Sequence, residues 1–212
     1  MSETGFHRQA SFGQDGVTFM DRAGMWLSGH QIRRRVGSLK GKDVCDFGCG
    51  FDAVFMRSVL ADVRSAILVD IMIAEDLKSL SKVTAIEGEL PGALERLPDK
   101  SLDVILGMAV LEHLWEPAET LAHCRRVLRP GGICALNVPS WLGKPVLEFL
   151  AFRLGFSPAS EMDDHKTYYD PRDLWPLLVR AGFVPHGIHC FRHKFGFATF
   201  AVCKVDQAVP GA

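Results

Sequence analysis

The sequence has little net charge, no long uncharged apolar run and no pair of cysteines spaced as C-x-x-C. Its 24 basic and 25 acidic residues leave a formal net charge of −1. Such a balance creates no long-range field to hold a phosphate backbone, which argues against nucleic acid as a partner. Since a membrane-spanning helix needs about 18 or more apolar residues in succession, we also expect a soluble chain without a transmembrane segment.

The cysteines and the polar first residues of the sequence indicate the cellular compartment. Several of the six cysteines lie in apolar runs, where a free thiol behaves as a small core residue; the six are Cys45, Cys49, Cys124, Cys134, Cys190 and Cys203. Residues 1–5 are polar and lack the apolar core of a secretion signal. Together these features favour a reduced, cytoplasmic protein.

Short apolar runs alternate with helix-length segments along most of the chain. With 212 residues, 48% of them hydrophobic, the composition is typical of one compact domain. Strands are predicted over 43–47, 65–69, 82–86, 102–107, 133–138, 183–191 and 196–205, and helices over 18–36 (amphipathic), 52–62, 72–80, 117–128 and 171–181. The pattern predicts an α/β fold: a Rossmann-like, doubly wound seven-stranded mixed sheet whose last two strands form an antiparallel hairpin.

The most informative segment is a glycine turn between a predicted strand and a predicted helix. The apolar run that contains Asp46 leads into Gly48-Cys49-Gly50, where two glycines let a ligand approach the backbone without meeting a Cβ atom. Asp70 closes the next apolar run, 20 residues after Gly50. A carboxylate at that position accepts hydrogen bonds from a ribose diol, so the segment predicts a site for an adenosine-containing cofactor.

Two cofactor classes fit the glycine spacing. Residues 48–53 formally satisfy G-x-G-x-x-G/A, the fingerprint of a dinucleotide site, so an NAD-dependent oxidoreductase is one alternative. Asp46 and Asp52 argue against it, because a carboxylate about 4 Å from a diphosphate costs on the order of 4 kcal/mol at an effective dielectric near 20. S-adenosylmethionine (SAM) carries an ammonium and a sulfonium, which carboxylates attract. The sign of the charge therefore favours SAM.

Three blocks of the sequence resemble the class I SAM-dependent methyltransferases, in the small-molecule group that includes the ubiquinone and menaquinone methyltransferases. Residues 44–50 resemble the first motif of that family. Residues 97–105 are similar to the segment entering its fourth strand, and residues 110–114 with 126–132 to the helix and turn that lead into its fifth. The resemblance covers about residues 40–140.

This resemblance implies a set of cofactor contacts. The acidic strand end and the glycine turn would bind the methionine end of SAM, Asp70 the ribose hydroxyls and Glu89 the adenine amino group. The full implied set is Asp46, Gly48, Cys49, Gly50, Asp70, Ile71, Met72, Glu89, Leu90, Met108 and Ala109. The third glycine or small polar pair of the family is replaced here by Phe51 and Asp52.

Two histidines are candidate catalytic bases for an oxygen acceptor. His113 follows the fourth predicted strand on a short helix, and His165 lies in a block that resembles the tail of methyltransferases of glycan, lipid and natural-product pathways. A purely structural role for either histidine stays open. We predict no metal, because the spacing of a zinc site is absent from His186, His189, Cys190 and His193.

The sequence therefore predicts a SAM-dependent methyltransferase, with S-adenosylhomocysteine as product, that O-methylates a small sugar, lipid-linked or natural-product acceptor. A non-catalytic partner subunit with the same fold is a further alternative. The single domain, 1–212, would comprise an N-terminal cap (1–39), a SAM-binding core (40–140), an acceptor-side insertion (141–167) and a final helix and hairpin (168–206). The apolar stretch 141–156 would cover the acceptor, form a homodimer contact or pack onto the sheet.

Overall fold

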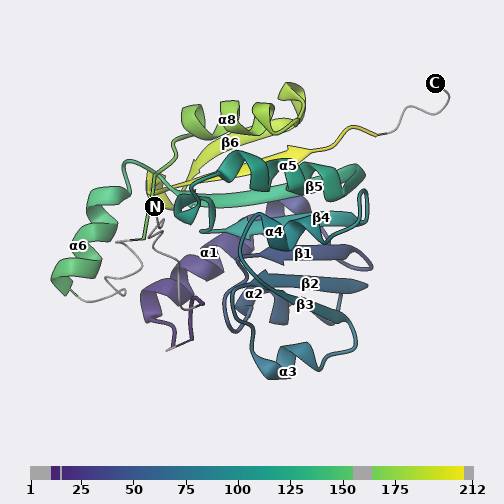
Figure 1. Cartoon of the computed structure of the whole chain (residues 1–212). Helices are drawn as coiled ribbons and strands as arrows, with labels where there is room; N and C mark the ends of the chain where they lie inside the picture. The colour runs from purple at the N-terminus through teal and green to yellow at the C-terminus, as the bar shows by residue number, and fades with distance from the viewer. Residues whose placement is uncertain (1–10, 15, 155–163, 208–212) are drawn as a thin grey trace, which may run out of the picture.

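A computed structural model describes residues 11–14, 16–154 and 164–207. They form a seven-stranded sheet in the order β3-β2-β1-β4-β5-β7-β6 (Figure 1). The strands are β1 (Asp43–Phe47), β2 (Ser65–Asp70), β3 (Val83–Glu87), β4 (Leu102–Met108), β5 (Leu128–Pro139), β6 (Ile188–His193) and β7 (Ala198–Lys204). The first five pair in parallel, whereas β7 runs antiparallel to both β5 and β6. The predicted mixed sheet with a terminal antiparallel hairpin is confirmed.

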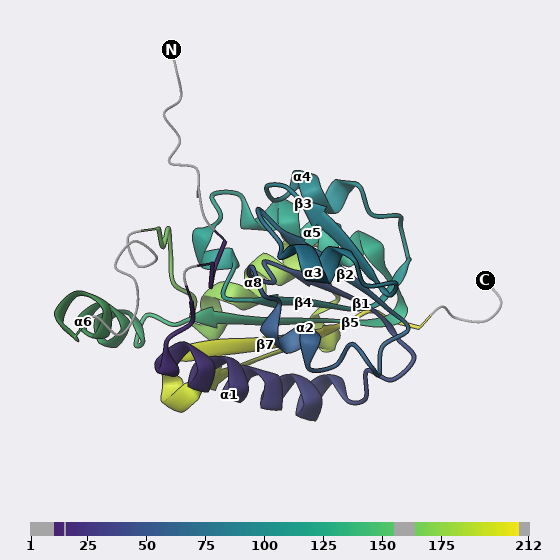
Figure 2. The same ribbon diagram turned by 90° about the horizontal axis from the view of Figure 1, so that it is seen from below.

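Helices cover both faces of this sheet (Figure 2). One face carries α1 (Phe19–Val36), α2 (Val54–Arg57) and α3 (Glu75–Lys78), and the other carries α4 (Gly92–Glu95), α5 (Pro117–Val127) and α8 (Pro171–Arg180). Along β1, Val44 packs into the core on the α1 side, whereas Cys45 and Phe47 pack into the core on the α5 side. Because strand side chains alternate between faces, a continuous apolar run supplies both cores.

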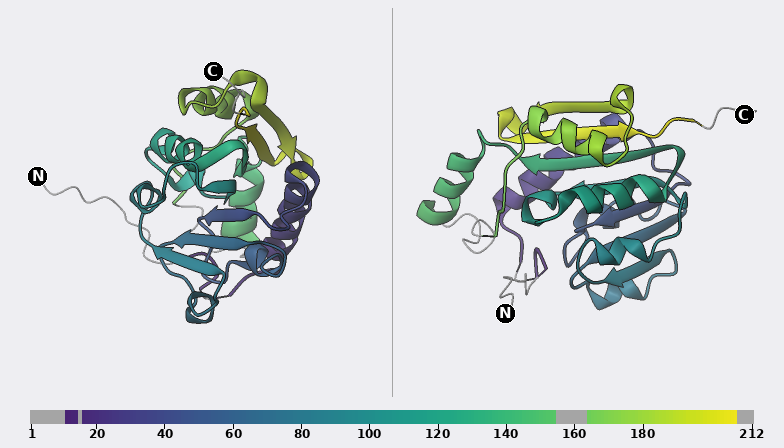
Figure 3. Two further views of the ribbon diagram at one scale, coloured as in Figure 1. Left: turned by 90° about the vertical axis from the view of Figure 1, so that its right-hand side faces the viewer. Right: turned by 45° about the horizontal axis from the view of Figure 1, so that its top comes forward.

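The strand order reverses at β1, which lies between β2 and β4. The chain first builds outward from β1 to β3 and then returns to place β4 on the other side of β1. Figure 3 shows the sheet twisting between the two helical layers. Open α/β sheets bind ligands at the carboxyl ends of the strands beside such a reversal, so the topology directs attention to the loops after β1, β2 and β4.

Two predicted helices are shorter than the sequence indicates. Within 52–62 only α2 is helical, and within 72–80 only α3. Beyond α2 the Ser58 amide bonds to the Phe55 carbonyl three residues back, and the Ser58 hydroxyl donates to the same carbonyl. A serine hydroxyl that competes for a backbone acceptor in this way favours turns over a continuing α-helix. The predicted full-length helices in these two segments are therefore wrong.

Some element boundaries also differ from the prediction. β5 begins at Leu128 rather than at residue 133, and the short helix α4 was not predicted. β6 begins at Ile188 rather than at residue 183, because Pro185–Gly187 form a 3₁₀ turn, η2. Pro185 has no amide hydrogen to donate to a strand ladder, which delays the strand.

α1 confirms the helix predicted over 18–36 but not its amphipathic character. Thr18 and Asp21 form a reciprocal capping box at its start. Ile32 is buried in the core beside the sheet, whereas Phe19 and Trp26 are 82% and 69% exposed. Apolar side chains thus lie on both the buried and the exposed sides of α1.

The segment after β5 stands apart from the sheet. α6 (Lys144–Leu154) projects from the side where the parallel strands end (Figure 1). Residues 155–163, which belong to the predicted acceptor-side insertion, lie outside the described residues. Within the described part of the chain, no helix combines the length and apolar character needed to cross a bilayer.

Candidate active site

A cavity of about 820 Å³ opens where β1, β2 and β4 end. The glycine turn after β1 forms one wall, and α1 with residues 12, 13 and 17 forms a second. The rest of the wall comes from the segments after β3 and β4, from α6, from residues 164–166 and from the turn between β6 and β7. The cavity therefore lies at the reversal of strand order, where an α/β sheet leaves room for a ligand.

Glycine is required at the first position of the turn after β1. Gly48 has a φ of +65°, and a Cβ atom added to it would lie 2.3 Å from the Val110 side chain. The amides of Gly48 and Cys49 both donate to the Val69 carbonyl, at 2.7 and 3.2 Å, which ties the turn to β2. The turn is therefore held in a conformation, and against a neighbour, that a larger residue would disrupt.

Asp70, the last residue of β2, links the turn to the neighbouring strand. Its Oδ2 accepts a hydrogen bond from the Gly50 amide at 2.8 Å. Its Oδ1 accepts one from the Ile71 amide at 2.8 Å and another from the Ser11 hydroxyl at 2.6 Å. The carboxylate thus lies in the cavity wall with both oxygens directed by backbone amides.

Asp46, on β1, is buried, and no positively charged side chain lies beside it in the described part of the chain. Its Oδ1 has no hydrogen-bond partner within the described residues. Burial, and secondly the charge of Asp70, raise the pKa of Asp46 to about 8. A cation in the cavity would stabilise the ionised carboxyl group, whereas a diphosphate would be repelled. The residues present therefore fit the ammonium and sulfonium of SAM and not the pyrophosphate of a dinucleotide.

A histidine–carboxylate pair lies on another wall of the same cavity. His113, in the 3₁₀ turn η1 (Leu111–His113), places its Nδ1 at 2.9 Å from Oδ2 of Asp164. Both side chains are nearly buried, at 11% and 13% exposure. Lys166 forms an ion pair with the other Asp164 oxygen, and its backbone amide donates to the Glu112 carbonyl at 2.6 Å. Residues 164–166 are thereby fastened to η1.

His165 packs edge-on against His113, with ring centroids 4.8 Å apart. Its Nδ1 lies 3.2 Å from the hydroxyl of Tyr168. The two histidines come from distant parts of the sequence, and the loop before α8 brings them together at the cavity wall. Such a pair of imidazoles supplies nitrogen atoms that can donate or accept a hydrogen bond.

The sequence and structure comparisons agree with this geometry. Residues 45–136 match the family model described as a methyltransferase domain. A probable S-adenosylmethionine-dependent methyltransferase of Mycolicibacterium smegmatis is 29% identical over 167 residues, which are 74% of this chain and 59% of that protein. A ubiquinone biosynthesis O-methyltransferase of Psychrobacter arcticus is 28% identical over 186 residues, covering 79% of this chain and 68% of that protein. The crystal structure of a SAM-dependent methyltransferase from Archaeoglobus fulgidus has the same fold, with a TM-score of 0.62 at 18% identity over 84% of this chain and 93% of its own.

Residues 45–136 therefore carry a methyltransferase domain, and the mycobacterial relatives that match most of this chain are probable SAM-dependent methyltransferases. The predicted family and its cofactor, SAM, are thereby confirmed. The chain spans 59–60% of the length of the first mycobacterial relatives that it matches.

Nearly all of the residues singled out from the sequence line the methyltransferase cavity. They are Asp46, Gly48, Cys49, Gly50, Asp70, Ile71, Glu89, Leu90, Met108, Ala109, His113 and His165. Met72 does not line it, and its side chain is 38% exposed. Ala109 has a φ of +59°, a strained conformation for a residue with a Cβ, and its amide donates to the Asn137 carbonyl at 2.7 Å. Strain of this kind is common where a backbone is fitted to a ligand.

The sequence reasoning missed further polar residues of the cavity, among them Glu112, Asp164 and Lys194. Asp164 precedes His165 directly, so proximity in sequence was an available signal. Burial lowers the pKa of Lys194 to about 8, with Glu112 and Asp21 acting in the opposite direction. Lys194 has a φ of +50°, again unusual for a residue with a side chain. Lys194 does not belong to a recognisable motif.

One group in the methyltransferase cavity has the composition of a metal site. Glu112, His113 and His165 offer ligand atoms within 4.8 Å of one another, and two imidazoles with a carboxylate suit several divalent metals. A second such group lies at the surface: Glu95, Glu119 and His123. The four residues weighed in the sequence as zinc ligands form no such group within the described part of the chain: His186, His189, Cys190 and His193.

Proposed function

We propose that this chain transfers the methyl group of SAM to a hydroxyl oxygen of a small acceptor that binds beside His113. One observation carries the proposal: a single cavity contains both the acidic glycine turn and a histidine held by a nearly buried carboxylate. The ubiquinone biosynthesis O-methyltransferases among the relatives support oxygen as the atom methylated. We retain a sugar, lipid-linked or natural-product acceptor as the substrate class, bound by a single domain that spans residues 1–212.

The cofactor half of the cavity would hold SAM through the residues named from the sequence. Asp46 would bind the ammonium end, the Gly48–Gly50 backbone would allow close approach, Asp70 would accept from the ribose, and Glu89 would bond the adenine amino group. Met108 and Ala109, at the end of β4, would line the sulfonium. When bound, SAM supplies a methyl group activated by the positive charge on its sulfur. The protein is left to position the acceptor and to exclude water.

His113 would act as the base. Asp164 accepts the proton of His113 Nδ1, which fixes the tautomer whose Nε2 is an acceptor. The acceptor hydroxyl would donate to Nε2, and its proton would pass to that nitrogen as the oxygen bonds to the methyl carbon and the carbon–sulfur bond breaks, leaving S-adenosylhomocysteine. Asp164 also stabilises the imidazolium that results, while Lys166 keeps the carboxylate in place.

The acceptor side of the cavity combines these polar groups with apolar walls. Leu114, Val146, Leu147 and Phe197 line it together with the histidines. Apolar lining removes water from the methyl-transfer path and suits an acceptor with an apolar body and a hydroxyl group. The apolar stretch 141–156 thereby gains a role at the acceptor site through Val146 and Leu147.

The test is a binding and turnover experiment on the purified chain. Calorimetry should detect S-adenosylhomocysteine and no NADH, and Asp70→Ala should remove the signal for the nucleoside. Incubation with methyl-labelled SAM and pooled sugar, lipid and phenolic alcohols should then identify labelled ethers, with and without a metal chelator. Binding of NADH in place of S-adenosylhomocysteine would contradict the cofactor assignment, and label on nitrogen or carbon only would contradict the oxygen acceptor.

A further inference from the structure

The segment before α1 crosses the glycine turn. Ser11 is buried, and its hydroxyl donates to Oδ1 of Asp70 at 2.6 Å. The next residue pairs with the turn itself, because the Phe51 amide donates to the Phe12 carbonyl at 2.8 Å. A Cβ added to Gly50 would lie 3.1 Å from that same Phe12 carbonyl oxygen. We call residues 11–14 the strap, since they lie against the turn at both its glycine and its acidic neighbour.

The strap uses part of the hydrogen-bonding capacity of Asp70. Each oxygen of an ionised carboxylate accepts about two hydrogen bonds. Oδ1 already accepts two, from Ser11 and from the Ile71 amide, and Oδ2 accepts one from the Gly50 amide. One position therefore remains, whereas a ribose diol presents two hydroxyl donors.

We propose that Ser11 is an internal competitor for the ribose subsite, and that the strap must leave Asp70 before the cofactor binds fully. The inference rests on the proposed placement of the ribose at Asp70. The Ser11 hydroxyl offers Asp70 the same chemistry as a ribose hydroxyl: an O–H donor to a carboxylate oxygen. Phe12 and Gly13 line the same cavity, so departure of the strap also opens the wall that leads into α1.

The competition has a thermodynamic consequence. If the chain binds the cofactor only when the strap is displaced, the apparent dissociation constant equals the intrinsic one divided by the fraction displaced. A hydrogen bond to a charged group shifts such an equilibrium by about tenfold or somewhat more. By reciprocity, cofactor binding must loosen the strap by the same factor.

The first experiment measures S-adenosylhomocysteine affinity by calorimetry on the full chain. Ser11→Ala should tighten binding by about tenfold, because the competing hydroxyl is gone. Ser11→Thr keeps the hydroxyl and should bind within about twofold of the unmodified chain. Ser38→Ala, the same change at an exposed serine away from the cavity, serves as the matched control and should have no effect.

Unchanged or weaker binding by Ser11→Ala would overturn the proposal, since the hydroxyl would then be neutral or would assist the cofactor. Asp70→Ala separates this failure from a failure of the proposed function. If Asp70→Ala loses affinity while Ser11→Ala gains none, only the competition is wrong. If Asp70→Ala binds as the unmodified chain does, the ribose placement is wrong and both proposals fall.

A second readout needs no variant. Hydrogen exchange of peptides covering residues 11–14 should become faster when S-adenosylhomocysteine is added, because the strap leaves the turn. Slower exchange in those peptides would show that the strap closes over the cofactor and would overturn the proposal. Peptides from β5 should not change and report that the sheet stays intact.

Discussion

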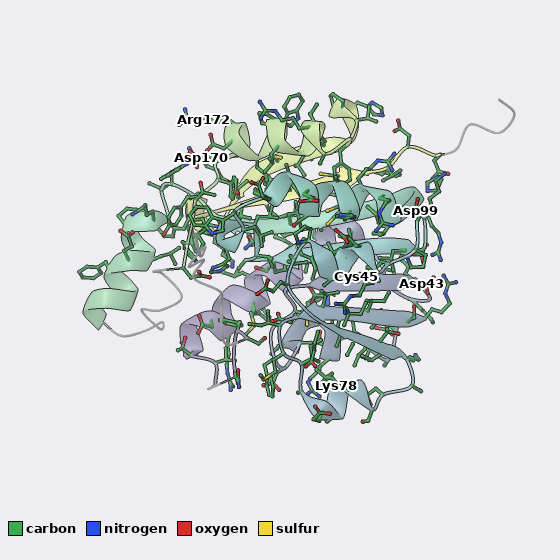
Figure 4. The ribbon with its side chains drawn as sticks, in the orientation of Figure 1. Asp43, Cys45, Lys78, Asp99, Asp170 and Arg172 are labelled. Carbon is green, nitrogen blue, oxygen red and sulfur yellow. The ribbon has the colours of Figure 1, made fainter. Side chains whose placement is uncertain are left out.

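Asp43 and Asp46 lie three residues apart on β1 and have opposite electrostatic environments. Asp43, at the start of the strand, pairs with Arg64 and with Arg129, whose Nη1 lies 2.9 Å away, and these partners hold the pKa of its carboxyl well below the usual range. Asp46, near the end of the same strand, has a pKa raised to about 8 by burial and by Asp70. Figure 4 labels Asp43 at the end of the sheet opposite α6.

The difference separates a structural charge from a functional one. At the amino end of the strands, two arginines neutralise Asp43 and its neighbour Asp103. At the carboxyl end, the buried carboxyl of Asp46 has no cation beside it in the described residues, which destabilises the protein unless a ligand supplies one. Changes at the amino end should therefore alter stability, and changes at the carboxyl end should alter binding and turnover.

The largest effect is expected at the proposed base. His113→Gln should lower the rate of methyl transfer by about 10²- to 10⁴-fold, the usual contribution of general-base catalysis. S-adenosylhomocysteine affinity should stay within about twofold, because the glycine turn is unchanged. Asp164→Asn should lower the rate less and should shift the pH profile of turnover. Full activity of His113→Gln would show that His113 is not the base and only packs in the cavity wall.

Asp46→Asn should weaken S-adenosylhomocysteine binding by about a hundredfold, since a charged contact to the ammonium is lost. The same change should stabilise the cofactor-free chain near pH 7 by about 1–2 kcal/mol, because folding then no longer has to protonate a carboxyl group that is ionised in the unfolded chain. Calorimetry and urea unfolding measure the two quantities. A loss of affinity together with a loss of stability would mean that Asp46 supports the fold instead of the ligand.

Asp43→Asn should instead lower stability and leave cofactor affinity nearly unchanged. Removing a carboxylate that bonds Arg64, Ser65 and Arg129 should lower the free energy of unfolding by about 2 kcal/mol. S-adenosylhomocysteine affinity should change by less than about twofold, as expected for independent sites. Urea unfolding at pH 7 tests the first statement. Because the folded pKa of Asp43 is lowered, its stabilising contribution should also fade in acid below its ordinary value of 3.8.

The smallest predicted effect is a pH dependence of cofactor affinity. A cation favours ionised Asp46, whose pKa in the cofactor-free chain is about 8, so binding below that pH must release a proton. Affinity for S-adenosylhomocysteine should therefore rise by up to about tenfold between pH 6.5 and pH 7.5. Calorimetry in buffers of different ionisation enthalpy also counts the proton released. Asp46→Asn should flatten the profile, and a dependence that persists in this variant would point to another group.

The sequence predicted the sheet better than the segments that connect its strands. The strand 43–47 and the glycine turn were predictable because an apolar run, two glycines and an acid in the next strand are local signals. The short helices α2 and α3 were not, since Ser58 after α2 and Ser79 after α3 each donate a hydroxyl hydrogen bond to a carbonyl three residues back, which propensity does not reveal. Likewise, nothing local to residue 11 indicates that its hydroxyl meets Asp70.

Local chemistry by itself determined the strand–turn–strand unit and the identity of its acids, because backbone freedom at glycine and the alternation of strand side chains depend on neighbours in sequence. Tertiary structure alone decided that Asp46 lacks a cation while Asp43 has two, and that Asp164 reaches His113 across 51 positions. The charge state of a carboxyl group depends on burial and on ions a few ångströms away, and folding brings those ions from distant parts of the chain.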